Sequence, residues 1–207
     1  MKKIGITGNI GSGKSQVTSY LLSKGYKVLD ADKLVAEIYS DRNFVSEMIG
    51  AFGNQIVGEN RLENNQELVL DKKAIAMLVF KEDKLLDKLN KLISPYINQK
   101  MKLQITEYEK TEEILFLDIP LLYEKNMEKD LDKVILVYCD DSIRFKRASH
   151  RDGKTVEEIM TVDSFQMPQD KKLDLADYVI RNNASIEELK LEIDTVLEII
   201  NMIKDKR

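Results

Sequence analysis

Five short apolar runs lie along the chain, separated by longer stretches in which apolar residues recur with helical periodicity. A strand buried between two layers of helices is apolar along its whole length, so each run predicts one strand of a parallel sheet. Strands that alternate with helices favour a three-layer α/β/α fold with a five-stranded sheet and right-handed crossovers. The predicted strands are Lys3–Thr7, Lys27–Asp30, Ile114–Asp118, Lys133–Tyr138 and Tyr178–Ile180.

The long segment between the second and third strands, Lys33–Glu113, is much longer than the single helix that a crossover needs. Its periodicity predicts several helices, and Ser94-Pro95 is expected to separate two of them because proline is tolerated in a first helical turn. The segment is therefore expected to be a helical subdomain inserted into the sheet domain. The predicted helices are Leu34–Tyr39, Phe44–Phe52, Lys72–Phe80, Lys84–Ile93 and Tyr96–Tyr108, with a polar surface loop over Gly58–Asn65.

The last helix carries a start signal. Ser185 and Glu188 have the spacing of a capping box, which predicts the first turn of that helix. Apolar residues then recur on one face, as expected for a helix that packs on the core. They are Ile186, Leu189, Ile193, Val196, Leu197 and Ile200.

The residues after the first strand, GNIGSGKS at Gly8–Ser15, match the phosphate-binding pattern G-x-x-x-x-G-K-[ST]. Its glycines allow the tight turn that brings backbone N–H groups to phosphate oxygens. Lys14 is expected to reach the β- and γ-phosphates, and the Ser15 hydroxyl suits Mg²⁺. A helix predicted over Gln16–Ser23 would point its N-terminal dipole at the anion. The pattern predicts that ATP or GTP is held by Gly8, Asn9, Ile10, Gly11, Ser12, Gly13, Lys14, Ser15 and Gln16.

Carboxylates end the second and third predicted strands. Ligands of such sheets lie outside the carboxyl ends of the strands, so Asp30, Asp32 and Asp118 are expected near the phosphates. One or both of the first two could orient an attacking hydroxyl or bind Mg²⁺, and we favour Asp32 beside the acceptor hydroxyl. An ordinary helix cap is the other interpretation. Asp118 has the position of a Walker-B aspartate, which touches Mg²⁺ directly or through water.

Two further segments allow a functional and an ordinary interpretation. Arg147 and Arg151 share a face of a helix predicted from Asp141, and guanidinium groups match phosphate oxygens. They either belong to a mobile lid that closes over ATP or form surface salt bridges. The residues after the third strand either contact an apolar part of an acceptor or form a buried turn; they are Pro120, Leu121, Leu122 and Tyr123.

Composition narrows the class of protein. The chain has 207 residues, a net charge of −4 and no concentrated basic block, which argues against a nucleic-acid partner. The single cysteine, Cys139, and the single histidine, His150, exclude a disulfide framework and a cysteine-based zinc site, and both are expected to be incidental. No apolar run is long enough for a membrane span, and no signal peptide precedes the loop, so a cytoplasmic protein is expected.

Other nucleotide-binding classes fit less well. A GTPase needs a guanine-reading N/T-K-x-D segment, and Asn90-Lys91-Leu92-Ile93 lacks its aspartate. A motor or transport ATPase is usually larger. A small P-loop chain with a helical insertion and an arginine-bearing lid is most simply a kinase for a small molecule.

The motifs of the chain, in their order, resemble those of the dephospho-CoA kinase family, whose members phosphorylate the ribose 3′-hydroxyl of dephospho-CoA in the last step of coenzyme A synthesis. The matching segments run across nearly the whole chain. They are GITGNIGSGKS (Gly5–Ser15), VLDAD (Val28–Asp32), SPYI (Ser94–Ile97), LDIPLLYE (Leu117–Glu124), RASHRDG (Arg147–Gly153) and ADYVIRN (Ala176–Asn182).

The resemblance implies three parts. They are a nucleotide core at about residues 1–32, 113–140 and 168–207, a helical CoA-binding insertion at about 33–112, and a lid at about 141–167. It also implies ATP and Mg²⁺, with Asp32 as the catalytic base, Lys14 and Arg147 as catalytic groups, and Ser15 and Asp118 at the metal. We expect a monomer whose partners are ATP and dephospho-CoA.

The sequence departs from the family pattern at Asn9, Gln16, Ala36, Ser94 and Arg181. Family members usually have Gly at the place of Asn9 and Thr at that of Gln16. They often have Arg or His at the place of Ala36, and they usually have His at Ser94 and Asp at Arg181. The departures leave open a kinase for another hydroxyl acceptor, such as a nucleoside or nucleotide. They also leave open a regulator that only binds nucleotide.

Overall fold

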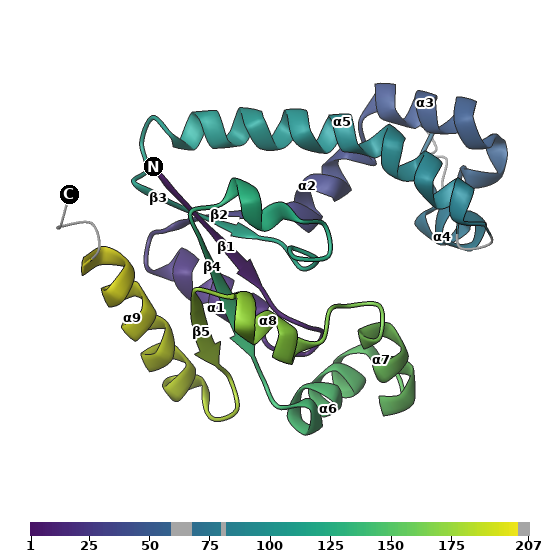
Figure 1. The fold of residues 1–207 in the computed structure, drawn as a ribbon. Coiled ribbons are helices and arrows are strands. Elements are labelled where there is room, and N and C mark those ends of the chain that lie inside the picture. Colours follow the sequence, from purple (N-terminus) through teal and green to yellow (C-terminus); the bar gives the residue numbers. More distant parts are fainter. Residues whose placement is uncertain (59–67, 80–81, 203–207) are drawn as a thin grey trace. The chain divides into compact units, whose positions relative to one another are not determined.

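The computed structural model describes residues 1–58, 68–79 and 82–202. The chain divides into two compact units (Figure 1). The first joins Met1–Asp30 to Thr111–Arg207, and the second is Ala31–Lys110. The sheet belongs to the first unit, and the second unit is helical.

The sheet has five parallel strands in the order β2-β3-β1-β4-β5. This confirms the predicted α/β fold, and the predicted strand ends are correct to within one residue. The continuous apolar runs predicted the strands correctly because a sheet covered on both faces buries its strands along their length. All five residues of β3, for example, are buried. The strands are β1 (Lys2–Thr7), β2 (Lys27–Asp30), β3 (Ile114–Asp118), β4 (Lys133–Tyr138) and β5 (Tyr178–Arg181).

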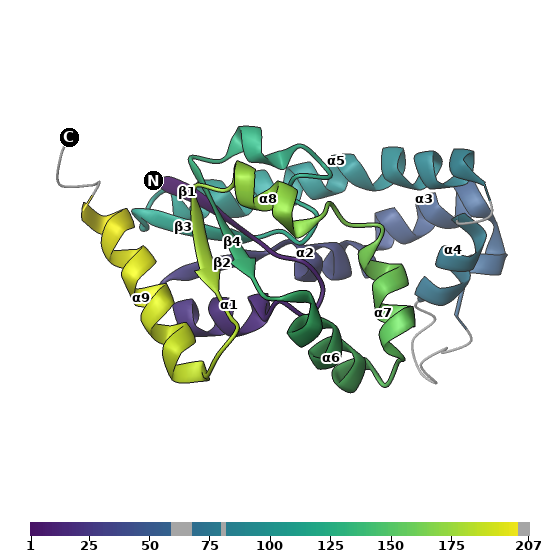
Figure 2. The same ribbon diagram turned by 60° about the horizontal axis from the view of Figure 1, so that its bottom comes forward.

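One face of the sheet packs against α1 (Lys14–Ser23) and α9 (Ile186–Met202), and α8 (Gln169–Leu175) lies across the sheet from α1 (Figure 2). Ile4 and Ile6 of β1 are fully buried in the core that these two helices share. The opposite face is covered closely. A Cβ added to Gly5 would lie 2.5 Å from Leu131 Cδ1 and 2.6 Å from Leu122 Cδ1.

The capping signal of the last helix is confirmed at its start. The Ser185 hydroxyl accepts a hydrogen bond from the Glu188 N–H at 3.2 Å, which satisfies one of the unpaired donors of the first turn. Of the six residues in the predicted apolar stripe, Ile186 is 41% exposed and the other five are buried. The stripe therefore begins one turn later than predicted.

Two helices follow β4. They are α6 (Asp141–Asp152) and α7 (Val156–Asp163), joined through Gly153 in the left-handed region. Thr155 caps α7 by a reciprocal capping box with Glu158. A short 3-10 helix, η2 (Met127–Asp130), precedes β4.

The second unit is built from four α-helices in its described part, with α5 contacting each of the other three. Asp41 and Asp71 each precede a helix and accept hydrogen bonds from two backbone N–H groups of its first turn. The aromatic rings of Phe44 and Tyr96 pack at 5.1 Å between centroids. The elements are α2 (Ala31–Ile38), α3 (Arg42–Phe52), η1 (Asn54–Ile56), α4 (Lys72–Val79) and α5 (Asp83–Tyr108).

The predicted break at Ser94-Pro95 is wrong, because α5 continues through both residues. Proline removes one N–H donor from the helix, and the Ser94 hydroxyl donates to the Asn90 carbonyl at 2.6 Å, which occupies a neighbouring acceptor. Packing on both sides of the proline, by Ile93 and Tyr96, supports the continuous helix. The loop predicted over Gly58–Asn65 lies outside the described residues from 59 onward, as does Phe80.

Candidate active site

The predicted phosphate loop connects β1 to α1 and requires glycine at two positions. Gly11 and Gly13 have φ of 77° and 88°, a region that residues with a side chain rarely adopt. A Cβ at Gly11 would lie 2.1 Å from the Arg144 carbonyl oxygen, and one at Gly13 would lie 2.0 Å from Asn182 Nδ2. Gly13 is also the N-cap of α1 and supplies no capping side chain. The first N–H groups of α1 are therefore available to an anion.

The carboxyl ends of β1, β2 and β3 meet at one edge of the sheet. Asp118 pairs in register with Ile6 on one side and with Asp30 on the other. Two hydrogen bonds tie the exit of β3 to β1: Ile119 N–H donates to the Ile6 carbonyl at 3.0 Å, and the Thr7 hydroxyl donates to the Pro120 carbonyl at 3.0 Å. The residue at the end of β3 is thereby fixed beside the phosphate loop.

Lys14 turns back from the start of α1 and forms an ion pair with Asp118. The Asp118 side chain is only 8% exposed, so its charge needs a close partner to offset lost hydration. The structure thus brings together two of the predicted site residues that are far apart in the sequence. The ion pair also keeps the Lys14 ammonium at the mouth of the loop, that is, at the carboxyl edge of the sheet where β3 ends.

The same edge offers ligands suited to Mg²⁺. The Ser15 residue is exposed in the first turn of α1, and Asp118 supplies a carboxylate nearby in the fold. Within the described ranges, the acidic, histidine and cysteine side chains form no group of three that could hold a metal by itself. Mg²⁺ usually takes one or two protein oxygens and completes its shell with phosphate and water. A hydroxyl and a carboxylate fit that requirement.

The segment after β3 is more buried than an acceptor-binding surface would be. Leu122 is fully buried against Gly5, and Tyr123 is 6% exposed. Burial, with smaller contributions from Asp177 and Glu128, raises the pKa of Tyr123 to about 12. The expected acceptor contact of Leu122 and Tyr123 is therefore not supported, because neither offers an apolar surface. Pro120 and Leu121 keep intermediate exposure, and for them the contact stays a prediction.

The arginines of α6 have different environments. The Arg147 guanidinium donates to the Asn182 carbonyl at 2.7 Å, and its Nη1 lies 3.5 Å from Cys139 Sγ. Arg151 is exposed and pairs with the adjacent Asp152 at 2.7 and 2.8 Å. Both lie on α6 as predicted, and a role toward ATP stays a prediction. Burial raises the pKa of the Cys139 thiol, in keeping with an unreactive group.

Arg144, which the sequence did not single out from its neighbours, is the most buried arginine of this helix. Its guanidinium binds Asp163 through two hydrogen bonds of 2.6 and 2.7 Å, and its Nε donates to Asp141 at 2.8 Å. Burial lowers the pKa of Arg144, but the hydrogen bonds to the two carboxylates outweigh it, and the pKa is raised overall. Arg144 Nη1 also donates to the Ile10 carbonyl of the loop at 3.2 Å.

Asn9, the departure inside the loop, has a specific structural partner. Its Nδ2 donates to Asp163 Oδ1 and to the Met167 carbonyl, both at 3.1 Å. Gln166 accepts from the Ile10 N–H at 2.9 Å. Asp163 and Gln166 are residues that the sequence analysis missed. No local pattern marks them, because their partners in the loop are more than 150 positions away, and the unusual Asn9 was the only signal.

Gln16, a second departure, lies beside the end of β5. Asn182 Nδ2 donates to the Ser12 carbonyl at 2.8 Å and lies 3.5 Å from Gln16 Oε1. The loop is therefore held from the last strand as well as from α6. Asn182, the last residue of the segment Ala176–Asn182, thus contacts the loop directly.

Asp32 lies in the first turn of α2, in the second unit, and is exposed. The helix begins at Ala31, three residues before the predicted start at Leu34, so Asp32 is inside the helix rather than its cap. A carboxylate in a first turn interacts favourably with the helix dipole. Ala36 also lies on this helix. Asp30 ends β2 at the level of Asp118.

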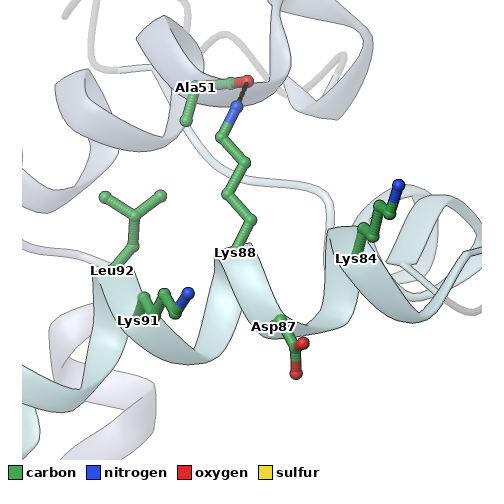
Figure 3. Close-up of a pocket in the computed structure, with 6 residues that line it drawn as sticks. All are labelled: Ala51, Lys84, Asp87, Lys88, Lys91 and Leu92. Atoms are coloured by element: carbon green, nitrogen blue, oxygen red, sulfur yellow. Dashed lines mark hydrogen bonds between the residues drawn. The ribbon is translucent and has the colours of Figure 1, made fainter.

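The second unit contains a cavity of about 470 Å³ between α3 and α5 (Figure 3). Lys88 crosses it and donates to the Ala51 carbonyl at 2.7 Å. Three of its lining residues are lysines, and all three belong to α5. The lining residues are Ala51, Lys84, Asp87, Lys88, Lys91 and Leu92.

A sequence model of the dephospho-CoA kinase family matches residues 2–188. The match covers the loop, the helical unit and all five strands. The chain belongs to the dephospho-CoA kinase family. The family makes it a kinase, an enzyme that uses ATP to phosphorylate dephospho-CoA in coenzyme A biosynthesis.

Individual proteins similar to this chain agree with the assignment. A dephospho-CoA kinase of Fusobacterium nucleatum is 34% identical over 197 residues, which cover 95% of this chain and 97% of the relative. A crystal structure of TT1252 from Thermus thermophilus has a TM-score of 0.82 at 34% identity and covers 95% of this chain and 96% of its own. Dephospho-CoA kinase from Campylobacter jejuni has a TM-score of 0.70 at 26% identity, with 97% and 98% covered.

Among the helices of the described residues, none is both long and apolar enough to cross a bilayer.

Proposed function

We propose that the chain transfers the γ-phosphoryl group of ATP to the ribose 3′-hydroxyl of dephospho-CoA, giving coenzyme A and ADP. The observation that carries the proposal is the ion pair between Lys14 and Asp118 at the mouth of a matched phosphate loop. The pair places the Lys14 ammonium, which can bind phosphate, and the Asp118 carboxylate, which can bind a metal ion, beside the expected position of the γ-phosphate. Family membership supplies the acceptor.

Each residue has a proposed role. The loop backbone of Gly8–Ser15 and the Lys14 ammonium hold the phosphates. Ser15 and Asp118 would hold Mg²⁺, which would supply positive charge to neutralise the phosphate oxygens. Asp32 accepts a hydrogen bond from the attacking hydroxyl. Because phosphoryl transfer passes through a largely dissociative transition state, these groups act mainly by position and charge.

The two compact units receive separate tasks in this proposal. The first is the nucleotide core, with α6 and α7 as its lid and Arg147 and Arg151 directed to phosphate oxygens. The second binds the acceptor. We further propose that the protein acts in the cytoplasm as a monomer, with ATP and dephospho-CoA as its small-molecule partners.

The function is tested with a coupled assay of ADP release. The purified protein, ATP and Mg²⁺ are expected to release ADP when dephospho-CoA is added and not when it is omitted. A panel of nucleosides and nucleoside monophosphates replaces dephospho-CoA in parallel. Faster turnover of another member of that panel would identify a different hydroxyl acceptor. Tight ATP binding without turnover on any acceptor would instead identify a nucleotide-binding regulator.

Asp118→Asn is expected to weaken the response to Mg²⁺. A carboxylate that orients the metal through water typically contributes about 10- to 100-fold to metal affinity or activity, so half-maximal activity should need about tenfold more Mg²⁺. The measurement is a Mg²⁺ titration of the initial rate at saturating ATP. Asp130→Asn is the matched control, because it removes an exposed carboxylate in η2. Identical titration curves for Asp118→Asn and the wild-type protein would contradict the metal role.

A further inference from the structure

A buried cluster connects the phosphate loop to the end of α7. Asp163, the last residue of α7, accepts hydrogen bonds from the side chains of both Asn9 and Arg144. The Asn9 amide reaches Oδ1 at 3.1 Å, and the guanidinium reaches Oδ1 and Oδ2 at 2.6 and 2.7 Å. One carboxylate therefore joins the loop, α6 and α7.

The cluster is shielded from water, and hydrogen bonds in such surroundings contribute more to stability than exposed ones do. The side chains of Arg144 and Asp163 are 2% and 17% exposed, and Asn9 is 2% exposed. An exposed ion pair contributes little, but removal of one partner of a buried pair leaves an uncompensated charge. Arg144 has a second carboxylate, Asp141, whose side chain is 60% exposed. Asp163 is thus the buried partner that fixes the guanidinium.

The cluster also holds the loop backbone between Gly8 and Gly11. The Ile10 carbonyl accepts from Arg144 Nη1 at 3.2 Å, and the Ile10 N–H donates to Gln166 Oε1 at 2.9 Å. Met167 is held at both ends, since Asn9 donates to its carbonyl at 3.1 Å and its N–H donates to Glu124 at 2.7 Å. Both backbone groups of Ile10 are therefore bonded to the lid segment.

We propose that Asp163, with Asn9 and Arg144, is a positioning residue for the phosphate loop. The cluster holds the backbone of Asn9 and Ile10 in the phosphate-binding conformation before nucleotide arrives. This inference rests on the proposed function in that the loop's ligand is the phosphate chain of ATP. The proposed role also explains why asparagine rather than glycine stands at position 9. A glycine there would leave Asp163 Oδ1 and the Met167 carbonyl without the amide donor.

The expected consequence is preorganisation. A loop with three glycines loses much conformational freedom when it is ordered, and a loop ordered during folding does not impose that cost on binding. Loss of the cluster should therefore weaken ATP binding more than it slows the chemical step. None of the three side chains needs to touch the transferred phosphoryl group.

The test compares Asn9→Gly, Asp163→Asn and the double variant. Asn9→Gly is expected to raise the Kd of a non-hydrolysable ATP analogue and the KM for ATP about tenfold, the loss typical of a hydrogen bond to a charged group. The kcat should fall less than threefold, and the KM for dephospho-CoA should stay within twofold. Asn9→Gly removes the hydrogen bond between Asn9 and Asp163, and Asp163→Asn replaces its charged acceptor by a neutral one. Because both changes act on the same bond, the double variant should bind the analogue less than twofold more weakly than Asp163→Asn does.

Asp174→Asn is the matched control, because it changes an exposed carboxylate on α8 to the same amide. If Asp163→Asn fails to fold, Asn9→Gly decides the question, since it leaves the Arg144–Asp163 pair intact. A lower Tm with an unchanged Kd for the analogue would overturn the inference, as would fully additive effects. Because the analogue is measured without acceptor, a protein inactive on dephospho-CoA can still support or refute the cluster.

Discussion

Lys14→Ala is expected to lower kcat by at least about 10²–10³-fold while the protein stays folded. Removal of one charged donor aimed at developing negative charge typically has this effect. In this structure Lys14 is the ammonium at the mouth of the loop, and it is already placed there by Asp118. The measurement is kcat in the coupled assay, with circular dichroism and Tm as the tests of the fold.

Two further variants separate catalysis from stability. Lys14→Ala also leaves the buried Asp118 without this partner, so some loss of Tm is expected. Lys14→Met keeps the length and volume of the side chain and should be equally inactive. Lys190→Ala, at an exposed position of α9, should behave like the wild-type protein. Unchanged turnover in Lys14→Ala would rule out the phosphate role.

Asp32→Asn is expected to lower kcat by about 10²–10⁴-fold with little change in the KM for ATP. This is the usual contribution of a general base, and the amide keeps the shape of the side chain but cannot take up the proton. Asp32 is exposed in the first turn of α2, where a carboxylate also gains from the helix dipole. The measurement is kcat at saturating ATP and dephospho-CoA.

Asp30→Asn gives the comparison that decides between the two aspartates. Asp30 ends β2 beside Asp118. Because Asp32 is the proposed base, replacement of Asp30 is expected to affect activity less than replacement of Asp32. A near-normal kcat in Asp32→Asn would refute its role as the base. If Asp30→Asn were the inactive variant, the role would pass to Asp30.

Local patterns predicted the fold well where burial is uniform. The strands of the sheet are covered on both faces, and their continuous apolar runs gave ends within one residue of those in the structure. The start of the last helix was also predicted, because Ser185 and Glu188 are close in sequence and bond locally. Such features depend on neighbours along the chain, which the sequence displays directly.

Local rules failed where packing outweighed them. A proline in a helical pattern predicts a boundary, yet α5 runs through Pro95 because Ile93 and Tyr96 pack on either side of it. The loss of one hydrogen bond is small beside the burial of such side chains.

The sequence by itself determined the chemistry of the loop, because Gly11, Gly13, Lys14 and Ser15 are consecutive or nearly so and their spacing carries the phosphate-binding geometry. Only the tertiary structure decided which distant side chains support it. Asp163 and Asn182 reach the loop across more than 150 residues, and Arg144 proved to be the buried one of the three arginines on α6. The physical reason is that a buried charge must find its partner in space, and no periodicity along the chain records where that partner lies.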